Sequence, residues 1–249
     1  MANYTISETS CLPSKGLIYN TEVVPEVTLR SMTTADEMRR LSHSDYPNKP
    51  ICDVLDSCVV SGLGMSSYDL CLGDYQFLLH KLRIATYGSK IKASTTCPIC
   101  KFVNEEEINL DEFTVKDFDE NCLSLLEVDL PVSKNHLKLR FQTPRIADKI
   151  SVGTTEMKKK AKDKFQDYGM LVTLTNVIES IDGRTPSVIE LEEWVRKLPM
   201  KDVNLIFANL SKFNDSIGLD CSMTANCYLC GYNYNLQYQP DSEFFRPTN

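Results

Sequence analysis

The sequence predicts an α+β fold in which a helical insertion interrupts a four-cysteine zinc ribbon. Three observations support it: apolar residues recur at helical spacing, strand-like alternation surrounds the cysteines, and two C-x-x-C pairs lie far apart in the chain. The expected regions are an initial strand with N-terminal helices (1–88), the ribbon with its associated β hairpins (89–140 and 217–239), an inserted helical bundle (141–216) and a short C-terminal tail (240–249).

The N-terminal region predicts a short strand followed by three helices. Alternating apolar residues around Val27 favour the strand. Thr34 and Glu37 have the spacing of a capping box, which would open the first helix. The third helix is expected to end at Gly88, because glycine commonly follows the last helical turn.

The segment between the cysteine pairs carries helical patterns of its own. Thr143 followed by Pro144 suits a helix start, and Ser187 with Glu190 has the spacing of a second capping box. The expected helices cover 144–164 with a break near Gly153, 165–181, 187–198 and 199–213.

Two C-x-x-C pairs form the one strong chemical motif: Cys97 with Cys100, and Cys227 with Cys230. The two-residue spacing lets both sulfurs of a pair reach one metal ion from a single tight turn, and two such turns supply four thiolates to Zn²⁺. Gly231 permits the backbone conformation that such turns often need. The motif predicts one structural zinc ion, because four thiolates leave no open position for catalysis.

The gap between the pairs is 126 residues, far above the roughly 15–20 residues of a compact zinc ribbon. Closing this longer loop costs about 2 kcal/mol more than closing a compact one. Structural zinc contributes about 10–16 kcal/mol in small domains. The separation is therefore no obstacle to a shared site.

Redox-active or simply buried thiols are the alternatives for the two pairs. A single C-x-x-C pair can be a redox site, but neither pair lies in a thioredoxin-like βαβ pattern. A zinc deaminase is disfavoured because Thr96 precedes Cys97 and no H-x-E motif exists. Cys221 has the wrong spacing for a ligand and is expected in the packing of the ribbon. The other cysteines are expected to be small core residues: Cys11, Cys52, Cys58, Cys71 and Cys122.

The charge distribution argues against a protein that mainly binds nucleic acid. The net charge is -7, the stretch 101–130 is acidic, and the run Glu105-Glu106-Glu107 would repel phosphate. The lysine-rich run 157–164 could contact an anionic partner, although such runs are more often a solvated helix face. Tyr232, Tyr234 and Tyr238 could stack on bases, but alternating strand tyrosines are more often core residues.

Neither a secretory signal nor a membrane span is readable, so we expect a cytoplasmic protein without a membrane partner. The sequence contains no G-x-S-x-G, P-loop or G-x-G-x-x-G motif. His80 lies in an apolar helical segment, where a packed histidine is expected rather than a catalytic base. No residue is indicated as catalytic, and we expect no enzymatic activity.

Several segments together resemble one known family. They are LPSKGLIY, LRSMTTADEMRRLS, ICDVLDSCV, LGDYQFLLHKLRIATYG, CPIC, the second C-x-x-C pair and FFRP. In this combination the chain resembles the baseplate hub assembly proteins of T-even-type bacteriophages over nearly its whole length.

The resemblance implies a late accessory protein of viral tail assembly in the host cell cytoplasm. Such a protein would act as a chaperone, bind phage baseplate hub proteins and be absent from the finished particle. One alternative is a structural subunit that stays in the hub. Two further alternatives are a nucleic-acid-binding zinc ribbon protein, which the net charge disfavours, and a redox protein.

Overall fold

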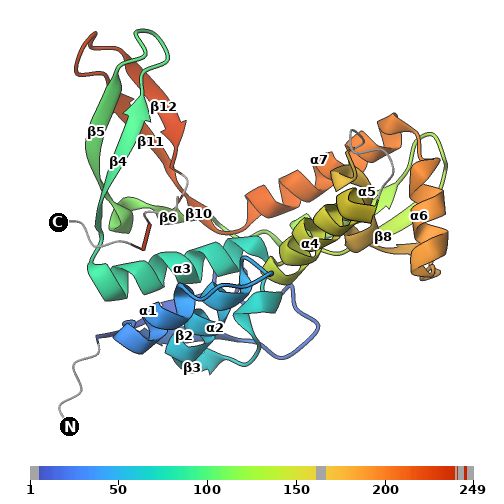
Figure 1. The fold of residues 1–249 in the computed structure, drawn as a ribbon, viewed down its shortest axis with the longest axis horizontal. Coiled ribbons are helices and arrows are strands. Elements are labelled where there is room, and N and C mark those ends of the chain that lie inside the picture. Colours follow the sequence, from blue (N-terminus) through green and yellow to red (C-terminus); the bar gives the residue numbers. More distant parts are fainter. Residues whose placement is uncertain (1–5, 161–166, 239, 241–243, 246–249) are drawn as a thin grey trace.

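The computed structural model describes residues 6–160, 167–238, 240 and 244–245. They form an N-terminal unit, a projecting arm and a distal lobe, as Figure 1 shows. One apolar core fills the N-terminal unit and the base of the arm, and a second core fills the distal lobe. Helices and small antiparallel sheets alternate along the chain, which confirms the predicted α+β class. No helix within these residues is long and apolar enough to cross a bilayer.

The N-terminal unit packs helices against an antiparallel sheet with the order β1-β2-β3. The strands are β1 (Ser7–Cys11), β2 (Val24–Arg30) and β3 (Val59–Leu63). The helical elements are α1 (Thr34–Arg40), α2 (Lys49–Cys58), the 3-10 turn η1 (Ser67–Asp69) and α3 (Leu72–Tyr87). Gly88 caps α3 with a φ of 85°, so the predicted helix end is confirmed.

The arm consists of two antiparallel hairpins from distant parts of the chain. One hairpin pairs β4 (Lys90–Thr96) with β5 (Val103–Asn109), and the other pairs β11 (Ser222–Asn226) with β12 (Asn233–Gln237). At the base, the 3-10 turn η2 (Leu110–Glu112) leads into β6 (Thr114–Val115), which pairs with β10 (Leu219–Asp220). The two segments that build the arm therefore already meet at its base (Figure 1).

Among the described residues, the distal lobe packs four α-helices and one 3-10 helix around a small antiparallel sheet. The sheet contains β7 (Glu127–Asp129), β8 (His136–Leu139) and β9 (Ile178–Ile181). The helical elements are η3 (Glu120–Leu126), α4 (Pro144–Lys160), α5 (Gly169–Val177), α6 (Val188–Arg196) and α7 (Met200–Ser216). The β7–β8 hairpin packs with the inserted helices in the second core, whereas the sequence interpretation grouped it with the ribbon.

Two helix predictions in the distal lobe are wrong. α4 is unbroken at Gly153, where an added Cβ would lie 3.1 Å from Val172 Cγ1, so this glycine serves close packing between helices. The helix predicted for 165–181 ends at Val177, because Ile178–Ile181 pair with β8 as strand β9, which contains two β-branched isoleucines. Lys158–Lys160 are exposed in the last turn of α4, and the rest of the lysine-rich run lies outside the described residues.

The two capping-box predictions have different outcomes. Ser187 and Glu190 form the predicted reciprocal pair at α6. At α1 the box is formed by Thr33 and Asp36, one residue earlier than predicted. Burial disfavours ionisation of Asp36, but hydrogen bonds from Arg30 and Thr33 hold the pKa of this carboxyl well below its usual range. Because Asp36 also forms an ion pair with Arg30, the capping box uses Asp36 and the helix begins one residue earlier than predicted.

Asp74, in the first turn of α3, ties the N-terminal LPSKGLIY loop to the junction between the cores. Its buried carboxylate accepts hydrogen bonds from the Ser14 N–H at 2.9 Å, the Ser14 hydroxyl and the Tyr19 hydroxyl at 2.7 Å. The Tyr19 oxygen in turn accepts the Cys71 N–H at 3.1 Å, and the tyrosine packs against both cores. The loop is therefore a structural clamp.

The same end of α3 lies close to the end of α7. A Cβ added at Gly73 would lie 2.5 Å from the carbonyl oxygen of Ile217, which is closer than real Cβ contacts. Glycine is thus required here, because any side chain would push the two lobes apart.

The opposite end of α3 supports the base of the arm. Arg83 is fully buried, and its guanidinium donates to the carbonyl oxygens of Gly88 at 2.7 Å, Lys90 at 3.3 Å and Phe244 at 2.7 Å. Phe244 and Phe245 are themselves buried in the first core. Two residues of the expected C-terminal tail therefore belong to the core.

We predict that Asp74→Ala lowers the free energy of unfolding by about 2–4 kcal/mol, because it leaves buried donors of Ser14 and Tyr19 without an acceptor. Urea and thermal unfolding would measure the change. Asp45→Ala is the matched control, since this aspartate is exposed. Equal stability of the Asp74→Ala and wild-type proteins would contradict the clamp.

Candidate metal centre

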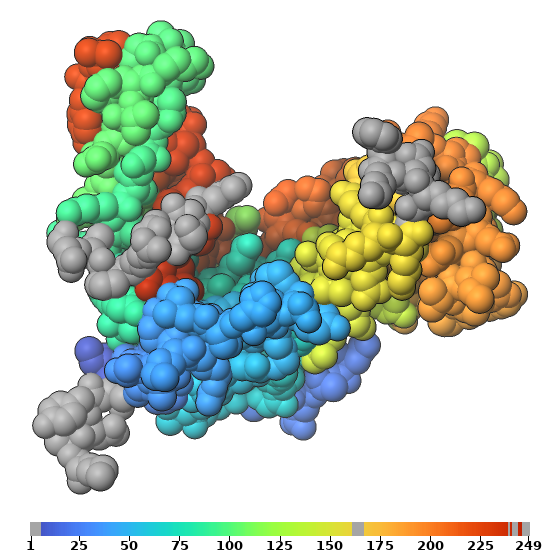
Figure 2. Space-filling view, viewed as in Figure 1, coloured from blue at the N-terminus to red at the C-terminus, as the bar shows by residue number. Residues whose placement is uncertain are grey.

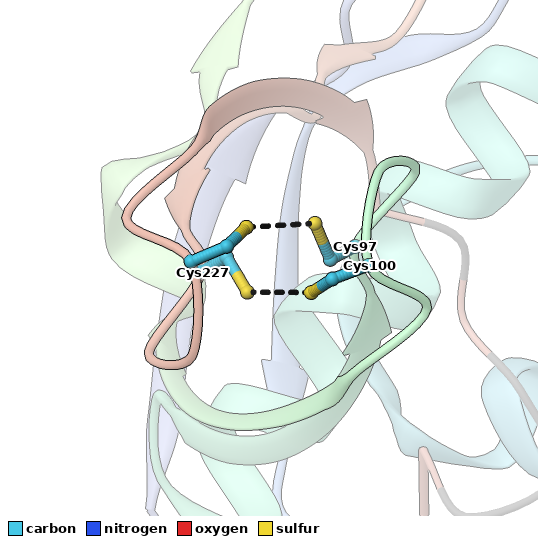
Figure 3. Close-up of side chains that lie close together, drawn as sticks. Cys97, Cys100 and Cys227 are labelled. Atoms are coloured by element: carbon cyan, nitrogen blue, oxygen red, sulfur yellow. Dashed lines mark hydrogen bonds between the residues drawn. The ribbon is translucent and has the colours of Figure 1, made fainter.

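The four predicted ligand cysteines meet at the outer end of the arm. Cys97 and Cys100 lie in the turn between β4 and β5, and Cys227 and Cys230 lie in the turn between β11 and β12. Among the described residues, these four form the group of side chains that could hold a metal ion. Figure 3 shows Cys97 and Cys100 of the first turn facing Cys227 of the second.

The sulfur atoms have the spacing that a tetrahedral metal ion requires. All four lie within 4.8 Å of one another. Cys97 Sγ is 3.7 Å from Cys230 Sγ, and Cys100 Sγ is 3.5 Å from Cys227 Sγ. Zinc–sulfur bonds of about 2.3 Å place tetrahedral ligands about 3.8 Å apart. The donor set therefore fits one ion, and its identity as zinc stays a prediction.

The two cysteine turns repeat the same backbone pattern. The Cys97 N–H donates to the Phe102 carbonyl at 2.9 Å, and the Cys227 N–H donates to the Tyr232 carbonyl at 2.9 Å. The residue after each pair has a positive φ, 62° at Lys101 and 70° at Gly231. The sequence indicated this conformation for the glycine, but lysine gave no such signal because it rarely adopts a positive φ.

Backbone N–H groups in each turn point at sulfur and favour its ionised form. Burial opposes ionisation of Cys227, but hydrogen bonds from the N–H groups of Cys230 and Leu229 lower its pKa to about 6. Burial likewise opposes ionisation of Cys97, yet N–H groups of its own turn lower the pKa of that thiol.

The second cysteine of each pair behaves differently. The Phe102 N–H favours the thiolate of Cys100, but burial and the neighbouring cysteines together raise its pKa to about 12. The pKa of Cys230 is also raised: the Tyr232 N–H favours its thiolate, but burial and hydrogen bonds with neighbouring cysteines outweigh it. Two thiols of the group therefore hold their protons at neutral pH until a cation displaces them.

Asn104 joins the two hairpins just below the cysteines. Its side chain is fully buried, its amide group donates to the Tyr234 hydroxyl at 2.8 Å, and its carbonyl oxygen accepts the Tyr228 N–H at 3.0 Å. The Thr95 hydroxyl also lies 2.8 Å from the Tyr234 hydroxyl. The sequence analysis did not identify Asn104. It lies four residues before buried Ile108 on β5, and this even spacing indicates that the two side chains lie on the same face of the strand.

The remaining cysteines lie apart from this group. Cys221 is half-buried against the first core, as expected for a residue in the packing of the arm. Cys11 is exposed on β1, so its prediction as a core residue is wrong, because the alternation of this strand turns it outward. The predicted core residues that are buried are Cys52, Cys58, Cys71 and Cys122.

A hollow of about 800 Å³ at the base of the arm brings His80 and Cys221 to one surface. His80 is buried beside the rings of Phe113 and Phe244, as the sequence predicts. Burial lowers the pKa of His80 to about 4 and raises the pKa of the Cys221 thiol. Burial therefore favours the uncharged form of both side chains.

Comparison with known proteins gives a family match that spans nearly the whole chain. A family model described as T4 bacteriophage base plate protein matches residues 2–246. No curated protein and no solved structure matches the chain. The matched span contains both cysteine pairs, the clamp around Asp74 and the buried Phe244.

We predict that Cys97→Ser or Cys230→Ser abolishes stoichiometric zinc binding and lowers the melting temperature, since either change breaks the four-sulfur group. Metal analysis after gel filtration and thermal unfolding would measure both effects. Cys221→Ser is the control and should keep about one zinc ion per chain. Full zinc retention in both ligand variants would refute the site.

Zinc affinity should fall steeply as the pH is lowered. Binding displaces the protons of Cys100 and Cys230, whose pKa values are raised, so the apparent affinity should drop by at least about a hundredfold per pH unit near neutrality. Below about pH 6 the proton on Cys227 adds to this competition. Competition with a chromophoric chelator at several pH values would measure the slope, and a flat profile would contradict thiolate ligation.

Proposed function

Because the chain belongs to the T4 bacteriophage base plate protein family, we propose that it is a non-enzymatic assembly factor for the central hub of the tail baseplate. The family match over residues 2–246 is the observation that carries this proposal. In this role the protein acts in the host cell cytoplasm as a chaperone, and its partners are phage baseplate hub proteins.

The four-cysteine group supports a scaffolding role for the arm. Four thiolates fill the coordination sphere of a tetrahedral zinc ion, so the ion would add rigidity and no reactive position. It would link the turns of two hairpins that Asn104 already joins near the cysteines and that the β6–β10 pair joins at the base of the arm. We therefore propose a zinc ribbon that holds a rigid projecting element for protein contacts.

The electrostatic features favour proteins over nucleic acid as partners. The net charge is -7, and on β5 Glu105 is exposed while Glu107 forms an ion pair with Lys90 at 2.6 Å. Tyr234 uses its hydroxyl in the contact between hairpins, and Tyr238 is buried. The net negative charge of the chain therefore disfavours phosphate binding.

A structural subunit retained in the virion is the second candidate, because the family description names a baseplate protein without giving its stage of action. Both candidates require contact with hub proteins. They differ in stoichiometry: an assembly factor is released and reused, whereas a subunit remains at a fixed ratio in each particle.

We predict that purified protein, added to extracts of infected cells that lack it, yields more than one hub per added chain. A released factor can act repeatedly, so the chain should also be absent from purified particles. Electron microscopy would count hubs and quantitative mass spectrometry would count chains. A hub yield that saturates at a fixed number of hubs per added chain, with the chain retained in the particles, would identify a subunit. A hub yield that does not change when the protein is added would contradict both roles.

A further inference from the structure

We propose that the tip of the arm docks into another baseplate protein that presents an apolar depression bordered by lysine and arginine. The tip is defined by the large apolar side chains exposed around the cysteine group: Ile99, Phe102, Val103, Tyr228, Leu229 and Tyr232. The inference rests on the baseplate role proposed above, but not on whether the chain leaves the finished particle.

The exposure of the tip is the first observation. Ile99, Tyr228 and Leu229 are 64%, 69% and 66% exposed, and they lie between the paired cysteines of the two turns. The turns are brought together by sulfur atoms within 4.8 Å of one another, so these side chains belong to one end of the arm. Single exposed apolar residues are ordinary, whereas a group of large ones marks an interaction site.

The position of the tip leaves it accessible to a large partner. Figure 2 shows the arm standing clear of the distal lobe, with both cysteine-turn segments at its outer end. Both cores lie elsewhere, in the N-terminal unit with the arm base and in the distal lobe. The exposed tip residues therefore have no role in either core.

The backbone of the tip is held in place before any partner binds. The Lys101 N–H donates to the Cys97 carbonyl at 3.1 Å, and the Gly231 N–H donates to the Cys227 carbonyl at 2.8 Å. The Tyr228 N–H is held by buried Asn104. A preorganised surface loses little conformational entropy on binding, which favours docking over a purely structural explanation for the exposed side chains.

Charge distinguishes between the possible partners. Residues 222–238, which include the second turn, contain no charged side chain. In the first turn, Lys101 is exposed and its Nζ donates to the Pro98 carbonyl. Further along β5, Glu105 is exposed and Glu107 is ion-paired with Lys90. Four thiolates around a divalent cation add a formal charge of about -2 beneath the apolar side chains.

This combination specifies a protein partner with a cationic rim. An apolar centre of tyrosine, phenylalanine and aliphatic residues, depleted in charge, matches the core of protein interfaces. The negative charge below it complements lysine and arginine at the edge of the partner. The same charge disfavours nucleic acid and anionic lipid surfaces.

The test uses a photo-crosslinking residue, p-benzoylphenylalanine, at Tyr228 in the full chain during phage infection. The control carries it at Ile189, which is 74% exposed on α6. We expect adducts from the tip with another baseplate protein, through an apolar segment next to lysine or arginine. The proposal would be overturned if the tip formed adducts only with a second copy of the chain, with nucleic acid or with lipid. It would also be overturned if the tip formed no adducts beyond those of the control.

The identified partner is then purified and titrated against a tip variant, Ile99→Ser/Leu229→Ser. Zinc content and melting temperature should stay unchanged because both side chains are exposed, while affinity should fall at least about tenfold. The matched control is Val188→Ser/Ile189→Ser, which removes two exposed side chains from α6. Unchanged affinity of the tip variant would refute the docking surface. The hub yield in infected-cell extracts is measured separately from the affinity of the tip for its partner. The docking surface and the proposed assembly role can therefore be contradicted independently of each other.

Discussion

The carboxylate of Asp74 is the contact on which the arrangement of the molecule depends. It receives hydrogen bonds from Ser14 and Tyr19 at the first turn of α3, where the two cores meet. Beside it, Gly73 lets α7 approach to backbone contact. Arg83 binds three carbonyl groups at the other end of the same helix and supports the arm. One helix thus fixes the distal lobe at its start and the arm at its end.

This arrangement explains why a metal site divided by 126 residues is physically reasonable. The intervening segment is not a free loop, since it folds around its own core. The β6–β10 pair then brings its ends together at the base of the arm. Most of the entropy of closing the loop is therefore lost when the distal lobe folds, and the cysteine turns meet with little further cost.

Features with a strong local signal could be predicted from the sequence. The cysteine spacing identified all four grouped sulfurs, and the Ser187–Glu190 spacing identified a real capping box. Predictions failed where distant contacts decide the local structure. Asp36 rather than Glu37 completes the first box because Arg30 binds it, and the residues after Val177 form a strand because β8 lies beside them. The spacing along β5 indicates the face of Asn104 but not its partner Tyr234, and no spacing indicates that Phe244 binds Arg83.

The order of synthesis gives the divided arm a further consequence. The first cysteine turn leaves the ribosome before the whole distal lobe, whereas the second turn follows it. At about 5–20 residues per second, the 126-residue gap corresponds to roughly 6–25 s of translation. During that interval a nascent chain carries half of the metal site and half of the exposed tip. The metal site is complete only after Cys230 has emerged, and the exposed tip only after Tyr232 has emerged, so a shorter nascent chain cannot present the whole surface.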